Sequence, residues 1–114
     1  MFIGNRGDVV VVLYPFQEDV GRAKLRPAVI IRNNGPEEYY ICQITKTNRF
    51  GKQAGKWILE KSPEGIQMGL TFDSYVNYDN RVNLNHKLFY RKIGFYPFID
   101  ELEDYLESIG EDIY

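Results

Sequence analysis

The hydrophobic and polar positions in the first half of the chain predict strands separated by polar loops. Three apolar, β-branched runs of strand length occupy residues 8–14, 27–32 and 39–45. The Asn-Asn-Gly-Pro turn at 33–36 joins the second and third runs as a hairpin. The polar stretches 15–25 and 46–56 are expected to be exposed loops, and loops as long as the second are often functional.

The alternation of apolar and polar residues is weaker in the second half, but it still predicts short strands. These are expected at residues 57–59, 74–78, 81–84 and 89–94. The Ser-Pro-Glu-Gly sequence at 62–65 predicts a turn. Asn85 is expected to cap a short helical turn that follows it.

The last part of the chain has a helical pattern. Apolar residues recur at steps of three and four between residues 98 and 109, acids lie between them, and Gly110 is placed to end the helix. Five to seven short strands and one terminal helix indicate a mainly β, mostly antiparallel barrel. The 114 residues suit a single domain, 1–114, that buries its own core.

The formal net charge of −2 hides an uneven distribution of charge. The last 15 residues hold seven acids and no Lys or Arg, whereas residues 22–56 hold eight basic side chains and only two acids. That basic stretch can attract a polyanion, although charges that cluster in sequence also form ordinary solvated surfaces. The chain has 17 aromatic residues, and single-stranded RNA commonly stacks on such rings while cations follow its backbone.

Several kinds of chemistry are excluded by the residues that are missing. One Cys and one His provide neither a disulfide nor a zinc site, and no nucleotide-binding loop is present. Cys42, in an apolar run, is expected to be a buried hydrophobe, and His86, in a polar stretch, to be inert. We expect no cofactor or metal, no membrane span, and a reducing cytoplasm as the location.

An enzyme with these residues has to work without a cofactor or a His-centred triad. RNA cleavage allows this, because the substrate carries its own nucleophile in the 2′-hydroxyl. The protein then needs to align that oxygen with the phosphorus, neutralise the charge of the phosphorane and assist two proton transfers. Arginine and hydroxyl side chains can supply the charge stabilisation.

Four ordered sequence blocks resemble the MazF/PemK toxin family. The first is Gly-Asp and a hydrophobic strand at 7–12, and the second is Arg-Pro-Ala and another strand at 26–31. The third, at 41–45, ends in Ile-Thr, and the fourth, Gly-Leu-Thr-Phe-Asp-Ser-Tyr-Val at 69–76, resembles the family's Gly-Leu-x-x-(Asp/Glu)-Ser-x-Val segment. With the run leading to Ile93-Gly94, the resemblance extends over residues 7 to about 94.

This resemblance implies the toxin of a type II toxin–antitoxin system. The implied fold is an SH3-like small barrel of the CcdB/MazF/PemK type with short helices and a C-terminal α-helix. The implied activity is metal-independent, sequence-selective cleavage of single-stranded RNA to 2′,3′-cyclic phosphate and 5′-hydroxyl ends. The implied partners, besides the RNA, are a cognate antitoxin, whose acidic tail occupies the RNA groove, and a second copy in a homodimer.

The resemblance also carries residue roles. Arg26 matches the family's catalytic arginine, which implies phosphorane stabilisation and proton transfer to the leaving 5′-oxygen. Thr45 matches the catalytic threonine, which implies a hydrogen bond to the scissile phosphate. The remaining candidates for RNA binding are basic or polar residues in or near these blocks: Lys24, Lys46, Arg49, Lys52, Lys56, Ser74, Asn80 and Arg81.

The sequence does not identify the residue that acts as the general base. Gln17, Glu18 and Asp19 lie in the first loop, and Asp79 and Arg81 flank Asn80, which stands where many relatives have Gln. Two other interpretations compete with a toxin. One is a non-catalytic SH3-like RNA- or protein-binding module, favoured if Arg26 and Thr45 do not converge in space. The other is a regulatory protein whose acidic helix docks a partner.

Overall fold

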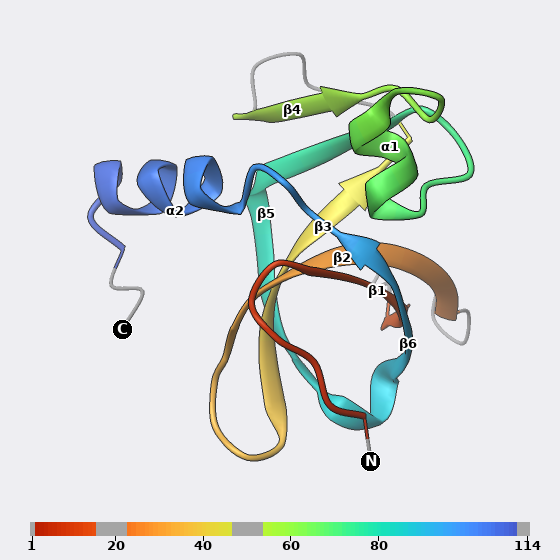
Figure 1. Ribbon diagram of the computed structural model, residues 1–114. Helices are drawn as coiled ribbons and strands as arrows, with labels where there is room; N and C mark the ends of the chain where they lie inside the picture. The colour runs from red at the N-terminus through yellow and green to blue at the C-terminus, as the bar shows by residue number, and fades with distance from the viewer. Residues whose placement is uncertain (1, 16–22, 47–53, 112–114) are drawn as a thin grey trace.

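The computed structural model describes residues 2–15, 23–46 and 54–111 (Figure 1). Strands dominate it, which confirms the expected mainly β fold. Within the described residues, no helix is long and apolar enough to cross a bilayer. The elements in chain order are β1 (Asp8–Pro15), β2 (Ala23–Asn33), β3 (Glu38–Thr45), β4 (Gly55–Ile58), α1 (Pro63–Met68), β5 (Ser74–Asn85), the 3-10 turn η1 (His86–Leu88), β6 (Phe89–Phe95) and α2 (Ile99–Ser108).

The strands form one antiparallel sheet in the order β4-β5-β3-β2-β1-β6. The sheet bends strongly but does not close, so the expected small barrel is an open one (Figure 1). Helix α1 packs on β6 so closely that a Cβ at Gly94 would lie 2.3 Å from the carbonyl oxygen of Gln67. A Cβ at Gly69, which ends α1 in the left-handed region with φ of +72°, would lie 2.2 Å from the carbonyl oxygen of Ile93.

The first hairpin is longer than the sequence predicts. Pairing between β1 and β2 continues to Pro15 and Ala23, so the expected loop at 15–25 is wrong at both ends. Polar residues join this ladder because its hydrogen bonds are made by the backbone, while Lys24 keeps its side chain exposed. Gly55 and Lys56 likewise belong to β4 rather than to the expected loop, since they pair with Asn77 and Val76.

Two expectations for the second half also need correction. The separate strands at 74–78 and 81–84 are one strand, β5, whose register against β3 shifts between Cys42 and Ile44 and absorbs the extra residues. The Ser-Pro-Glu-Gly sequence begins α1 rather than a turn. Ser62 is its N-cap, accepting a 3.1 Å hydrogen bond from the backbone N–H of Gly65.

Other expectations are confirmed. Asn85 caps η1 by accepting a hydrogen bond from the backbone N–H of Lys87 at 2.9 Å. The terminal helix α2 lies within the expected range of 98–109, and Gly110 follows it with φ of +79°. Cys42 is fully buried, and burial raises the pKa of its thiol, which makes it inert as a nucleophile.

The buried side chains form two clusters. The larger joins Val29, Cys42 and Val76 of the sheet to Leu102 and Leu106 of α2, and the smaller gathers around neighbouring strand residues that point the other way. Side chains alternate between the two sides of a strand, so the clusters mark two faces of the sheet. We call them the α2 face and the second face; members of the second cluster are Val10, Val12, Ala28, Ile30, Tyr39, Ile41, Leu84 and Phe89.

Candidate active site

Arg26 and Thr45 lie on the second face, at the same end of neighbouring strands. Val12, a member of the second cluster, pairs with Arg26, which places Arg26 on that face. The last ladder pair between β2 and β3 at this end of the sheet is Ala28 with Gln43, and Arg26 and Thr45 each lie two residues beyond it on their strands. Side chains two residues apart on a strand share a face, so Arg26 and Thr45 both lie on the second face at this end of the sheet.

The cross-strand alignment continues to the edge of the sheet. Thr45 pairs with Tyr75 on β5, and Tyr75 pairs with Trp57 on β4. Four residues from four strands therefore form one line on the second face, which we call the transverse row: Trp57, Tyr75, Thr45 and Arg26. Thr45 and Arg26 are partly exposed, so the row is accessible to a ligand.

Three further residues belong to the surroundings of the row. Tyr14, which pairs with Lys24 at the end of the first hairpin, is on the same face as Arg26. Burial raises the pKa of the Tyr14 hydroxyl, and the nearby positive charge of Arg26 partly lowers it, so the two groups are electrostatic neighbours. Gln43, two residues before Thr45 on β3, is 4% exposed, and its Oε1 accepts a hydrogen bond from Nδ2 of Asn80. This hydrogen bond fixes the position of the Asn80 side chain on the neighbouring strand β5.

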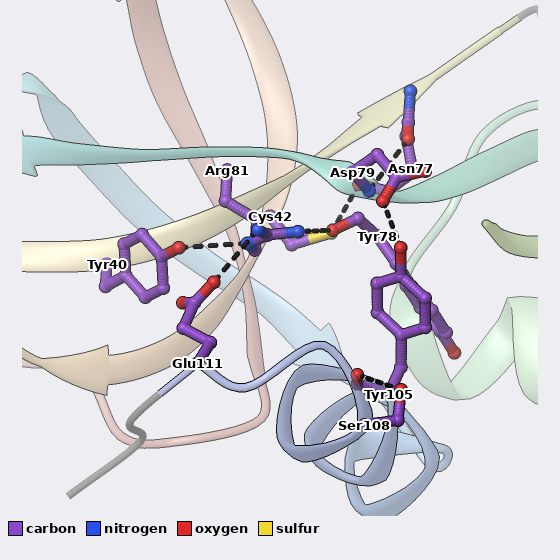
Figure 2. Close-up of polar contacts among 9 residues, drawn as sticks. All are labelled: Tyr40, Cys42, Asn77, Tyr78, Asp79, Arg81, Tyr105, Ser108 and Glu111. Carbon is purple, nitrogen blue, oxygen red and sulfur yellow. Dashed lines mark hydrogen bonds and ion pairs between the residues drawn. The ribbon is translucent and has the colours of Figure 1, made fainter. Parts of the chain in front are cut away.

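Two basic candidates, Lys56 and Arg81, lie on the α2 face. Lys56 Nζ is 2.7 Å from Glu101 Oε2 and 3.9 Å from the centroid of the Phe98 ring. Arg81 donates from Nε to the Tyr40 hydroxyl at 2.9 Å and lies 2.9 Å from Glu111 (Figure 2). The structure therefore separates Lys56 and Arg81 from Arg26 and Thr45.

Asp79 is also engaged with the helix side of the molecule (Figure 2). Its Oδ1 accepts a hydrogen bond from the Tyr105 hydroxyl of α2, and its Oδ2 accepts one from the backbone N–H of Ala54 at 2.8 Å. Both carboxylate oxygens thus hold structural elements together. Asp79 is placed to anchor α2 rather than to receive a proton beside Arg26.

Two more sequence candidates lie near the fourth sequence block. Ser74 is fully buried, and its hydroxyl donates a 2.8 Å hydrogen bond to the carbonyl oxygen of Phe72, so it shapes the turn before β5. Lys46 follows Thr45 and places its Nζ 4.3 Å from the centroid of the exposed Phe72 ring. Lys46 is exposed and presents its charge to solvent near the row, whereas Ser74 is buried.

A pocket of about 220 Å³ opens at the same end of the sheet. Its strand residues include Leu25 and Pro27, which flank Arg26, and its rim includes Phe72 and Arg91. Arg26 lines this pocket and also belongs to the transverse row. Two arginines and an exposed ring at one edge of the sheet give this end the character of an anion- and base-binding surface.

Of the remaining sequence candidates, the described residues include only His86, and it lies away from the row. Arg49, Lys52, Gln17, Glu18 and Asp19 lie outside the described residues. His86 lies at the far end of β5, where its backbone N–H donates to the carbonyl oxygen of Glu37 at 2.7 Å. Among the residues that the structure describes, no three His, Cys, Asp or Glu side chains are grouped to hold a metal ion.

Sequence reasoning missed Tyr14, Gln43, Tyr75 and Trp57. Tyr14 and Gln43 lie inside runs that were assigned to strands, and their side chains are distinguished only by which face they occupy. Strand alternation gives relative faces within one strand, but pairing across strands depends on register. The register shift between Cys42 and Ile44 has no local sequence signature, so the row was not visible in the sequence.

Comparison with known proteins identifies the class. The profile of the PemK-like, MazF-like toxins of type II toxin–antitoxin systems matches residues 5–104, and the chain belongs to this family. It is therefore a type II toxin, and such a toxin has an antitoxin partner. No curated protein matches the chain.

A solved structure with the same fold is the Mycobacterium tuberculosis toxin MazF-mt6. The two chains are 18% identical, the match covers 90% of this chain and 98% of that one, and the TM-score is 0.60. This likeness shows the fold, because identity at that level says little about individual residues.

Proposed function

We propose that this toxin is a metal-independent endoribonuclease that cleaves single-stranded RNA at the transverse row. The observation that supports the proposal is the position of Arg26 and Thr45, which lie on the second face at the same end of neighbouring strands and are partly exposed. Family membership supports the same activity, because endoribonucleases are typical of MazF-like toxins.

The chemistry follows from what these side chains offer to RNA. The 2′-oxygen attacks the adjacent phosphorus and loses its proton, the bond from phosphorus to the 5′-oxygen breaks, and the 5′-oxygen gains a proton. The products are a 2′,3′-cyclic phosphate and a 5′-hydroxyl. Negative charge grows on the phosphorane oxygens along this path, and donors aimed at that charge lower the barrier.

Arg26 is suited to hold the phosphorane. Its guanidinium can donate two parallel hydrogen bonds to phosphate oxygens, which fixes orientation as well as charge. Thr45 adds a hydroxyl from the neighbouring strand, and Asn80, held by Gln43, adds an amide that can donate or accept. Lys24 and Lys46, both exposed and adjacent to the row in sequence, guide the RNA backbone.

The same proposal covers the setting of the toxin. We place it in the cytoplasm, where mRNA is available and where its buried free thiol stays reduced. A homodimer is proposed because it is usual in this family. The antitoxin would bind over the row with an acidic segment, since carboxylates compete with RNA phosphates for Arg26.

The test is cleavage of a long RNA by the purified protein in EDTA. Arg26→Ala and Thr45→Ala should each lower the cleavage rate by about a hundredfold to a thousandfold, the effect of removing one transition-state donor. Arg6→Ala, which removes an exposed arginine bound to α2, is the matched control and should cut normally. Circular dichroism checks that each variant is folded.

Two further readouts separate this chemistry from contaminating nuclease. A single 2′-deoxy substitution at the cut position should abolish cutting there, because the nucleophile is gone, and the 5′ ends of the products should accept a phosphate directly. A folded wild-type protein that binds RNA but cuts none of a broad set would favour the non-catalytic binding module.

A further inference from the structure

We propose that Trp57 is a stacking platform for an unpaired RNA base beside the scissile phosphate. This inference rests on the proposed function and adds a binding residue to it. Trp57 ends the transverse row on β4, two strands away from Thr45. Neighbouring strands lie about 4.8 Å apart, so the indole is roughly 10 Å from Thr45 across the sheet, within the reach of a flanking nucleotide.

The Trp57 side chain is exposed and does not belong to either buried cluster. It is 52% exposed, whereas Ile58, the next residue, is 3% exposed and packs in the cluster under α2. Lys56, on the other side, also turns to the α2 face and pairs with Glu101. Strand alternation therefore directs Trp57 to the second face, where its ring meets solvent over much of its surface.

The indole is held from behind by a second ring. Tyr75, 5% exposed, lies between Trp57 and Thr45 in the row, and its ring centroid is 5.2 Å from that of Trp57 with the planes tilted by 56°. This packing limits the motion of the indole while leaving area free for a ligand. A pre-positioned ring loses little conformational freedom when a base stacks on it.

The charge of the surroundings selects a nucleic acid as the ligand. Arg26 and Lys24 share the second face with Trp57, whereas three acids of α2 and Glu111 beyond it pair with Arg6, Lys56 and Arg81. Aromatic rings combined with cations along one line are the usual arrangement for single-stranded RNA, in which every base has a face that can stack. The row thus provides a stacking position, a hydroxyl and a guanidinium in order.

The test uses the fluorescence of Trp57, which is the single tryptophan of the chain. The ligand is an RNA that the wild-type protein cuts, made with a 2′-deoxy sugar at the cut position so that it binds without reacting. Stacking should quench the emission in proportion to occupancy. Binding without any change in emission would overturn the proposal.

Variants then measure the contribution of the ring. Trp57→Ala should weaken binding of the same RNA about tenfold, whereas Trp57→Phe, which keeps a ring, should lose much less. Tyr90→Ala removes an aromatic side chain of similar exposure (59%) on β6 and serves as the control, with unchanged affinity. Thermal melting confirms that the variants are folded.

Three outcomes are distinguishable. Wild-type protein that neither cuts nor binds RNA removes the proposed function itself. Wild-type protein that cuts, together with Trp57→Ala that binds as tightly, keeps the function and overturns the stacking platform. Trp57→Ala that binds RNA normally but changes the oligomeric state in light scattering assigns the ring to a protein interface and overturns the proposal as well.

Discussion

The two faces of this sheet carry basic and aromatic residues alike, yet their surroundings differ. On the α2 face, Lys56 and Arg81 are paired with acids of the C-terminal segment. On the second face, Arg26 lies beside Thr45, with Tyr14 as an electrostatic neighbour. Charge alone does not identify a binding residue, because the same side chain that attracts RNA on one face holds a helix in place on the other.

The difference follows from where the acids lie. Three acids of α2 and Glu111, which lies beyond the helix, pair with Arg6, Lys56 and Arg81, so these four negative charges are neutralised within the protein. Arg26 and Lys24 lie on the second face. We expect substitutions on the α2 face to change stability and those on the second face to change RNA binding, and the following predictions test this division in order of decreasing effect.

The largest effect is expected from emptying the core under α2. Leu102→Ala removes a fully buried side chain and should lower the free energy of unfolding by about 2–5 kcal/mol, as for other large-to-small core substitutions. Urea denaturation measures the loss. RNA cleavage per folded molecule, measured at low temperature, should stay at the wild-type level, and Leu102→Met is the volume-matched control. Reduced cleavage by the folded fraction would show that a substitution on the α2 face affects activity as well as stability, and it would contradict this division.

A substitution on the second face should change both properties. Asn80→Ala leaves the buried Oε1 of Gln43 without its donor and should cost about 1–3 kcal/mol of stability. Asn80→Asp, similar in shape, adds a negative charge beside the row and should weaken RNA binding more than Asn80→Ala does. Titration of an uncleavable RNA separates the two variants; equal affinities would argue that Asn80 lies outside the RNA path.

High pH should weaken the α2 face. The hydroxyls of Tyr78 and Tyr96 are hydrogen-bonded at 2.5 Å, and burial raises the pKa of Tyr78 to about 12 and the pKa of Tyr96 as well. Unfolded tyrosine ionises near pH 10, so from about pH 10 upward the unfolded state loses protons that the native state keeps, and stability falls. Urea midpoints between pH 8 and pH 12 should show this decline.

The matched variant for that experiment replaces both phenols. Tyr78→Phe with Tyr96→Phe removes the two hydroxyls together and leaves neither unsatisfied, which keeps the cost at neutral pH small. Its stability should decline less steeply above pH 10. A decline as steep as that of the wild type would assign the alkaline sensitivity to other groups.

The smallest effect is expected at the exposed ion pairs of α2. Arg6 is 2.6 Å from Asp100 and also contacts Glu103, but its side chain is 45% exposed, so water and salt screen the interaction. Arg6→Met should lower stability by less than about 1 kcal/mol, and the difference from wild type should vanish in 1 M NaCl. A larger loss that resists salt would mean that the stem of Arg6 matters through packing.

The sequence predicts much of the fold because its main signals are local. Runs such as 8–14 and the stripe of α2 depend on residues within a few positions of each other, and they were placed correctly. The start of α1 was available in principle, since Ser62 and Pro63 form a common helix start. The open sheet was not predictable, because closure depends on how far strands bend and on what packs at their ends.

In the candidate site, too, the residues within local sequence blocks were predictable and those that depend on strand register were not. Arg26 and Thr45 were predicted because they lie in sequence blocks of a known family, and both lie on the second face at one end of the sheet. The distribution of the other basic residues over two faces was not predictable, since it requires the register of β5 against both β3 and β4. Lys56 shows this best: its charge suggested RNA, while its strand position directs it to Glu101.

The pairing of β1 with β6 has a consequence for the order in which the protein is made. Val9 pairs with Gly94, so β1 gains this second partner only after the 85 residues that follow Val9 up to Gly94 have been made. Segments emerge from the ribosome in sequence, and contacts between distant segments form late and slowly. The hairpin that carries Arg26 is therefore present early but unsupported on one side. The sheet of this toxin therefore cannot be completed before β6 has been translated.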